Sequence, residues 1–170
     1  MIWVDAFTDG SSRKNGKPDC VAGWAFVAFM GDKQFIRYGT IKKGASNNVG
    51  EIAGVLYATM VFGKHPDIGL SLKSDSKYVV NSINDWQHKY ALNDYLGIKN
   101  AEWLVPLYSV WNKSNNLKIS WVKGHSGNAG NEVADHYAGL GADSTVRDMK
   151  NDRFDIKYIS EDELLCLMMK

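Results

Sequence analysis

Three β-prone segments come before any helical segment in this chain, and this order constrains its fold more than any other feature. They are residues 2–8, 21–30 and 34–41, which are rich in aromatic and β-branched side chains, as is typical of strands. Gly31 and Asp32 leave only a short turn between the second and third segments. Because short turns join antiparallel neighbours, the chain is expected to begin with a three-strand antiparallel meander.

The hydrophobic period then changes to the helical spacing of about 3.6 residues. Helices are expected at residues 48–63, from residue 75, at 102–111 and at 128–140, and short strands at 70–74 and 117–122. Asn48 is expected to cap the first helix, with Glu51 three residues later as in a capping box. Helices that alternate with strands indicate parallel strands joined by crossovers. The order predicts an α/β domain with a mixed five-stranded sheet, in which parallel strands continue the meander and helices cover both faces.

Length and segment order predict one domain over residues 1–142 and a C-terminal extension over residues 143–170, since a domain usually has ~100–200 residues. Ser160 and Glu163 form a second capping-box pattern before an apolar run. The extension is therefore interpreted as a helix packed on the domain, with docking of a partner protein as the alternative. A monomer is expected.

The sequence gives no indication of a disulfide framework, a zinc site, a signal peptide or a membrane span. Cys20 and Cys166 form no Cys-x-x-Cys pair, and the histidines show no His-Glu-x-x-His spacing, so neither a disulfide framework nor a zinc site is indicated. The first ten residues have no basic segment typical of a signal peptide. The longest apolar run, residues 21–30, is too short to span a membrane. A cytoplasmic protein without membrane contact is expected.

Four acidic residues fall near the ends of the expected elements: Asp9, Glu51, Asp75 and Asp135. Each also has an ordinary interpretation, as a turn residue, a helix cap or a solvated helix position. The first and fourth strands are expected to be central neighbours, which would place Asp9 and Asp75 side by side. Sites in open α/β sheets form at the carboxyl ends of strands.

A cluster of these carboxylates would need cations, because like charges at one site resist ionisation. Oxygen ligands without cysteine or clustered histidine suit Mg²⁺, with Mn²⁺ as an alternative. Two such ions can activate a water and stabilise the leaving oxygen of a phosphodiester. The hypothesis depends on the four side chains lying together.

The segments that carry these acids resemble ribonuclease H of the bacterial type I class. They are Phe7-Thr8-Asp9-Gly10-Ser11-Ser12, Ser46-Asn47-Asn48-x-x-Glu51, Ser74-Asp75-Ser76-x-Tyr78-Val79, and Trp121-Val122-Lys123-Gly124-His125-Ser126-Gly127 followed by Asn131-Glu132-x-x-Asp135. The resemblance covers residues 1 to about 142. It implies the ribonuclease H-like fold and hydrolysis of the RNA strand of an RNA-DNA hybrid, giving 5′-phosphate and 3′-hydroxyl ends.

The resemblance also implies roles for single residues. Asp9 would bridge two metal ions, and Asp135 would help to hold the ion that activates the attacking water. Glu51 and Asp75 would hold the ion beside the leaving oxygen, with Glu51 near a ribose 2′-hydroxyl, the group that distinguishes RNA from DNA. His125, in a loop between two glycines, would move protons or assist product departure.

Substrate contacts are a further implication of the resemblance. The polar loop residues Ser46, Asn47 and Asn48 would lie near the minor groove and the DNA-strand phosphate, and Asn15 matches loosely. Gly10 and Ser11 would lie beside the site, and Lys77 stands where the family often has Gln. Trp86 and Tyr90 resemble the aromatic pair of a substrate-binding protrusion. Residues 91–99 contain one lysine, so this protrusion is expected to be weakly basic and to bind the hybrid with a shallow salt dependence.

The net charge of +1 does not exclude a nucleic-acid enzyme. Residues 1–142 carry 15 basic and 12 acidic side chains, a net charge of +3, and the extension carries −2. Four of the 12 acids are the candidate metal ligands, so bound cations would leave the domain strongly positive toward a polyanion.

Other interpretations stay open. The chain could be another nuclease of the same fold superfamily, an inactive nucleic-acid-binding module on that fold, or a fragment of a polymerase. The Trp121–Gly127 string speaks against the first, and the presence of all four carboxylates and His125 against the second. Met1 directly before the first strand favours a stand-alone protein over the third.

Overall fold

The computed structural model describes residues 1–41 and 44–143. The strands are β1 (Ile2–Arg13), β2 (Val21–Met30), β3 (Lys33–Ile41), β4 (Ile68–Ser74) and β5 (Leu117–Trp121). The helices are α1 (Asn47–Phe62), α2 (Lys77–Asn81), α3 (Gln87–Ala91), α4 (Ala101–Asn112) and α5 (Ala129–Asp143), with a π-helical turn η1 (Ser82–Trp86) between α2 and α3. The predicted extension, residues 143–170, lies outside the described residues together with its capping box, except for Asp143, which is the last residue of α5.

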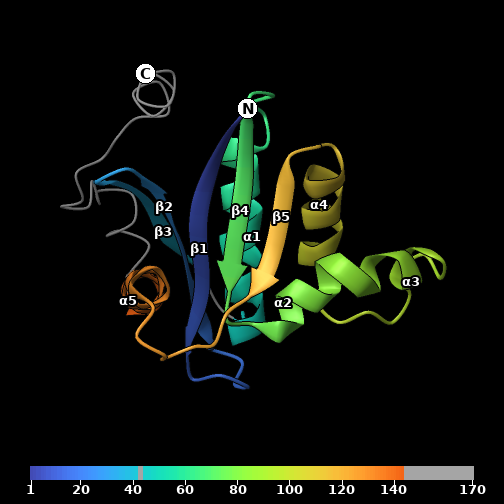
Figure 1. Cartoon of the computed structure of the whole chain (residues 1–170). Coiled ribbons are helices and arrows are strands. Elements are labelled where there is room, and N and C mark those ends of the chain that lie inside the picture. The colour runs from blue at the N-terminus through green and yellow to red at the C-terminus, as the bar shows by residue number, and fades with distance from the viewer. Residues whose placement is uncertain (42–43, 144–170) are drawn as a thin grey trace.

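The five strands form one mixed sheet in the order β3-β2-β1-β4-β5 (Figure 1). β1 pairs antiparallel with β2, and β2 antiparallel with β3, which confirms the predicted meander. β4 pairs parallel with β1 and with β5. The first and fourth strands of the chain are therefore central neighbours, as predicted, because the crossover through α1 returns the chain to the free edge of β1.

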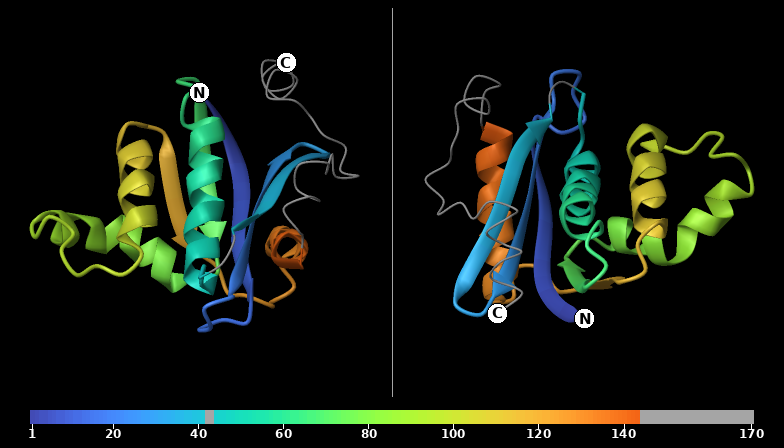
Figure 2. Two further views of the ribbon diagram at one scale, coloured as in Figure 1. Left: turned by 180° about the vertical axis from the view of Figure 1, so that it is seen from behind. Right: turned by 90° about the horizontal axis from the view of Figure 1, so that it is seen from above.

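Helices cover both faces of the sheet, as predicted (Figures 1 and 2). α1 and α4 lie on one face, where Ile52, Val55 and Leu107 pack with Val4 and Leu72 in the larger core. α5 lies on the other face and packs Ala134 and Ala138 against Phe7 and Val27. The alternation of side chains along β1 supplies both cores, since successive residues of a strand point to opposite faces.

Two local predictions near the N-terminus were wrong. β1 does not end at Asp9 and Gly10 but continues to Arg13, because the antiparallel ladder with β2 extends to the pair Arg13 and Val21. α1 is capped by Ser46 and not by Asn48: the Ser46 backbone is extended and its hydroxyl accepts the N–H of Val49 at 3.4 Å. Asn48 lies inside the first turn, and Glu51 is free for another role.

α2, η1 and α3 form one bent helical arm that projects from the sheet beyond β5 (Figure 1). Ser76 caps α2 with its hydroxyl, which accepts the N–H of Val79 at 3.3 Å. This confirms the helix start predicted at residues 75–76. Within the described ranges, none of the helices has the length and apolarity that a membrane span requires.

Candidate active site

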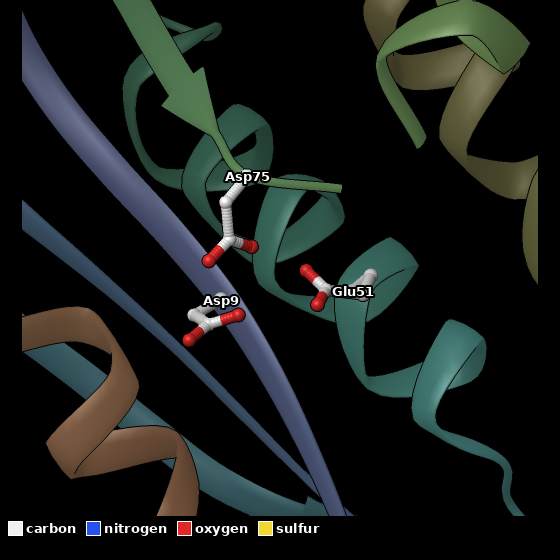
Figure 3. Close-up of side chains that lie close together, drawn as sticks. All are labelled: Asp9, Glu51 and Asp75. Atoms are coloured by element: carbon white, nitrogen blue, oxygen red, sulfur yellow. The ribbon is translucent and has the colours of Figure 1, made fainter. Parts of the chain in front are cut away.

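Three of the four predicted carboxylates converge at one point beside the sheet (Figure 3). Asp9, Glu51 and Asp75 each offer an oxygen, and these oxygens lie within 4.8 Å of one another. Thr8 and Ser74 are the last pair of the β1–β4 ladder, so Asp9 and Asp75 follow it side by side. β1 continues past the carboxyl end of β4, so β4 does not pair with Asp9, and the Asp9 carboxyl group meets that of Asp75 beyond the end of the ladder (Figure 3).

Glu51 reaches the same point because α1 touches β1 without side chains between them. A Cβ atom on Gly10 would lie 2.3 Å from the backbone nitrogen of Glu51, which no residue other than glycine permits. Gly50 lies equally close to the backbone of β2, where a Cβ would meet the carbonyl oxygen of Gly23. The contact brings the first turn of α1 onto the strand and turns the Glu51 side chain toward Asp9.

Burial makes this cluster electrostatically unfavourable in the absence of a cation. Asp9 and Glu51 are each only 4% exposed. Desolvation, helped by the charge of Asp75, raises the pKa of Asp9 to about 8. Desolvation and the neighbouring Asp9 raise the pKa of Glu51 well above its usual range. The two carboxyl groups interact directly, so without a cation they retain protons that a metal ion would replace.

The donor set fits a hard divalent cation. All three groups are carboxylates, and the Glu51 Oε2 atom is buried without a hydrogen-bond partner. A buried acceptor without a partner is rare in a folded protein, and an ion bound there would satisfy it. Mg²⁺ and Mn²⁺ both prefer such oxygen ligands.

Asp135 lies at the edge of this cluster. It is exposed on α5, and its carboxyl group contacts Asp9 closely enough to raise the pKa of Asp9 further. In the described part of the chain, the group of potential ligands within 4.8 Å comprises Asp9, Glu51 and Asp75 only. The structure therefore brings Asp135 to the site from the opposite face of the sheet, but not into the tightest group.

Asp75 is held in place by the last residue of β5 and by the loop that follows this strand. The indole N–H of Trp121 donates to the backbone oxygen of Asp75 at 3.0 Å. A Cβ on Gly124 would lie 2.7 Å from the Asp75 Oδ2 atom. The sequence reasoning gave neither residue a function of its own, although both stand in the string that carries the resemblance. The available signal was that Trp121 and Asp75 both stand near the ends of strands expected in one sheet.

His125 lies exposed in the loop between β5 and α5, with a backbone φ of 52°. This left-handed conformation is uncommon for residues other than glycine, but histidine, asparagine and aspartate adopt it more often than most. The preceding residue, Gly124, packs against the Asp75 side chain. His125 is therefore next to a residue that contacts the cluster, but it is not one of the clustered residues.

Several of the predicted substrate contacts lie near the neighbouring ends of β1 and α1. Asn15 and Ser46 have structural partners: the Asn15 side chain accepts the N–H of Asn47 at 3.1 Å, and Ser46 caps α1. Gly10 is buried and Ser11 half-buried, and the Ser11 hydroxyl accepts from Arg13 at 3.0 Å. Asn48 is half-buried in the first turn of α1.

The other predicted contacts lie on the helical arm. Trp86 and Tyr90 have ring centroids 6.3 Å apart, and Tyr78 packs 6.0 Å from Trp86. The aromatic pair is therefore assembled, and Tyr78 extends it. Lys77 begins the arm next to the carboxylates, with its ammonium 4.8 Å from the centre of the Trp121 ring.

Comparison with known proteins agrees with this fold. Residues 3–143 match the family model described as RNase H. A curated ribonuclease H of Francisella tularensis subsp. novicida (strain U112) is 37% identical over 142 residues, which are 79% of this chain and 88% of the relative.

Two solved structures share the fold at low sequence identity. LC9-RNase H1, described as a type 1 RNase H with the type 2 active-site motif, superposes with a TM-score of 0.69 at 20% identity, over 99% of this chain and 86% of that one. A foamy viral protease-reverse transcriptase in complex with RNA/DNA hybrid superposes with a TM-score of 0.68 at 17% identity, over 82% of this chain and 20% of that one. The family model, the curated relative and the shared fold lead to one conclusion: the chain belongs to the RNase H family.

Proposed function

We propose that this protein is an endoribonuclease that hydrolyses the RNA strand of RNA-DNA hybrids with two Mg²⁺ ions, leaving 5′-phosphate and 3′-hydroxyl ends. The observation that carries the proposal is the convergence of Asp9, Glu51 and Asp75 within 4.8 Å in a chain of the RNase H family. The relative from Francisella is named ribonuclease H, and the foamy viral relative was solved with an RNA/DNA hybrid.

The chain's own residues suit the binding of divalent cations. Asp9 would bridge two ions, Glu51 and Asp75 would complete one site, and Asp135 would complete the other from α5. Mg²⁺ bound there supplies Lewis-acid activation of a water and charge stabilisation at the leaving oxygen, and Mn²⁺ can supply the same chemistry. Burial of Asp9 and Glu51 keeps competing water away from these ligands.

His125 would accept or donate a proton near the attacked phosphate, because it carries an imidazole in an exposed loop beside the site. Trp86 and Tyr90 on the arm, with Lys77, would contact the backbone of the hybrid. Gly10, Ser11, Asn15, Ser46, Asn47 and Asn48, at the neighbouring ends of β1 and α1, would line the groove side of the substrate. Asn15 and Ser46 would act there mainly by holding the first turn of α1.

The test compares four labelled substrates in the presence of Mg²⁺: RNA-DNA hybrid, double-stranded RNA, double-stranded DNA and single-stranded DNA. Cleavage of the RNA strand of the hybrid alone is expected. Asp75→Asn keeps the shape of the side chain but removes one ligand charge, so it is expected to lower kcat by about 10³-fold or more. Cleavage of the DNA duplex, or full activity of the variant, would contradict the proposal, and failure of all four substrates would favour an inactive binding module of the same fold.

Three further properties remain proposals. The protein is proposed to act as a monomer in the cytoplasm. The segment from residue 143 onward is proposed to pack on the catalytic domain, with docking of a partner protein as the alternative. Size-exclusion chromatography with light scattering tests the monomer, fractionation of cells tests the location in the cytoplasm, and loss of melting temperature on truncation after Ala142 tests the packing of the segment.

A further inference from the structure

Asp75 is the one member of the carboxylate cluster that stands outside regular structure. β4 ends at Ser74, and the first residue of α2 is Lys77. The last backbone ladder bond in this region runs from the N–H of Val122 to the oxygen of Ser74, at 2.9 Å. The backbone of Asp75 therefore lies one residue beyond the support that the sheet provides.

The side chain of Trp121 extends that support by one residue. Its indole N–H donates to the backbone oxygen of Asp75 at 3.0 Å. Gly124 closes the turn from the other side, since its missing Cβ would lie 2.7 Å from the Asp75 Oδ2 atom. Asp75 is thus held at its backbone by an indole and confined at its carboxylate by a loop. A ligand that is orientated by neighbouring groups binds a metal ion more tightly than one that must be ordered on binding.

The same indole carries a cation on its ring. The Lys77 ammonium lies 4.8 Å from the ring centre, and both side chains are exposed, Trp121 to 44%. Lys77 forms no ion pair with any acid in residues 1–41 and 44–143, so its charge is available to a ligand. The ring limits the positions of the ammonium without neutralising it.

We propose that Trp121 is a positioning residue with two functions: it fixes Asp75 for metal binding through its indole N–H, and it holds the Lys77 ammonium beside the cluster as a contact for a backbone phosphate of the nucleic-acid substrate. The inference rests on the proposed function and deepens it. The two functions use different parts of the Trp121 side chain, the indole N–H for Asp75 and the ring face for Lys77. Substitutions can therefore separate them.

Trp121→Phe tests the first function, because phenylalanine keeps an aromatic ring under Lys77 but has no N–H. The Mg²⁺ dissociation constant, measured by calorimetry without nucleic acid, is expected to rise about tenfold. kcat for hybrid cleavage is expected to fall at fixed Mg²⁺ and to recover at high Mg²⁺. Circular dichroism checks that the variant is folded. A folded variant with the wild-type Mg²⁺ constant would overturn this function.

Lys77→Met tests the second function, because methionine keeps the apolar stem but loses the charge. The slope of log affinity against log salt for the hybrid, measured in Ca²⁺ to prevent cleavage, is expected to become shallower by about 0.9, the value for one lost phosphate contact. Lys77→Arg is expected to restore the slope, since a guanidinium also stacks on the ring. Lys33→Met removes an exposed charge at the start of β3 and is the matched control. A Lys77→Met slope equal to that of the control would overturn this function.

These outcomes are distinct from failure of the proposed function. If the wild type binds Mg²⁺ and the hybrid but cleaves no hybrid, the proposed function is contradicted, while the Mg²⁺ constants and the salt slopes still decide the two functions of Trp121. If the wild type cleaves the hybrid and both variants behave like it, only the inference about Trp121 is contradicted.

Discussion

A Cβ atom on Gly10 would lie 2.3 Å from the backbone nitrogen of Glu51, so β1 and α1 meet at a point where only glycine fits. This contact sets the distance between the Asp9 and Glu51 carboxyl groups. The candidate metal site therefore depends on backbone packing as much as on its acidic residues.

Gly10→Ala is expected to push α1 away from β1 and to separate the two carboxylates. Overpacking of a buried contact destabilises a protein by about 1–3 kcal/mol, and the Mg²⁺ affinity should fall as well. Thermal unfolding and calorimetry measure the two effects. Gly139→Ala is the control, because its Cβ would meet nothing closer than 3.7 Å and alanine favours a helix. Equal stability and metal binding of the two variants would refute the packing argument.

Stability without metal is expected to fall as the pH rises toward 8. The pKa of Asp9 is about 8 in the folded protein against an ordinary value of 3.8, so the folded state holds the proton more tightly than the unfolded state. This contribution is full below about pH 4 and is lost as the pH passes through 8. Asp9→Asn keeps an acceptor for the N–H of Gly10 and removes the charge.

The Asp9→Asn variant is therefore expected to be more stable than wild type in EDTA at pH 8–9, by on the order of a few kcal/mol. Melting curves in EDTA from pH 5 to pH 9 measure the difference. Added Mg²⁺ should stabilise the wild type and leave the variant almost unchanged. A variant that is less stable than wild type throughout this range would show that the buried charge is not destabilising.

His125→Asn is expected to lower kcat by about 10²-fold without changing the Mg²⁺ affinity, because it removes a proton-transfer group and no metal ligand. Asparagine tolerates the left-handed backbone at this position, so the loop should keep its conformation. Rates at saturating Mg²⁺, together with calorimetry, separate the two effects. His136→Asn, on the exposed surface of α5, serves as the control, and a rate loss as large there would argue against a specific role.

Substrate affinity should rise when the exposed leucines that follow the helical arm are replaced by lysine. Leu92 and Leu96 come directly after α3 and are 90% and 70% exposed, so lysines there would attract a polyanion. The double variant Leu92→Lys and Leu96→Lys is expected to bind the hybrid more tightly at low salt. Its slope of log affinity against log salt should become steeper by about 1–2. Met60→Lys, on α1 and 48% exposed, adds charge away from the arm. A slope change no larger than in Met60→Lys would mean that the arm does not contact the substrate.

The sequence by itself determined the class of fold, the strand order and the four acidic candidates. It could do so because the hydrophobic period changes from strand to helix after residue 47 and because the acids stand in strings typical of one family. It misplaced the end of β1 and the cap of α1, since Asp9-Gly10 is locally a turn pattern and Asn48 is locally a good cap. Pairing with β2 and the extended backbone of Ser46 decided these two points.

Only the tertiary structure decided which of these side chains meet, and why. Asp9 and Asp75 lie side by side because β1 and β4 end their ladder at Thr8 and Ser74. Glu51 joins them because Gly10 of β1 packs directly against the backbone of Gly50 and Glu51 in α1. Asp135 stays at the edge, and Trp121 holds Asp75 through an indole N–H. Such contacts join residues about 40 to 125 positions apart, and the energy that fixes them comes from close packing between elements, which local sequence patterns do not record.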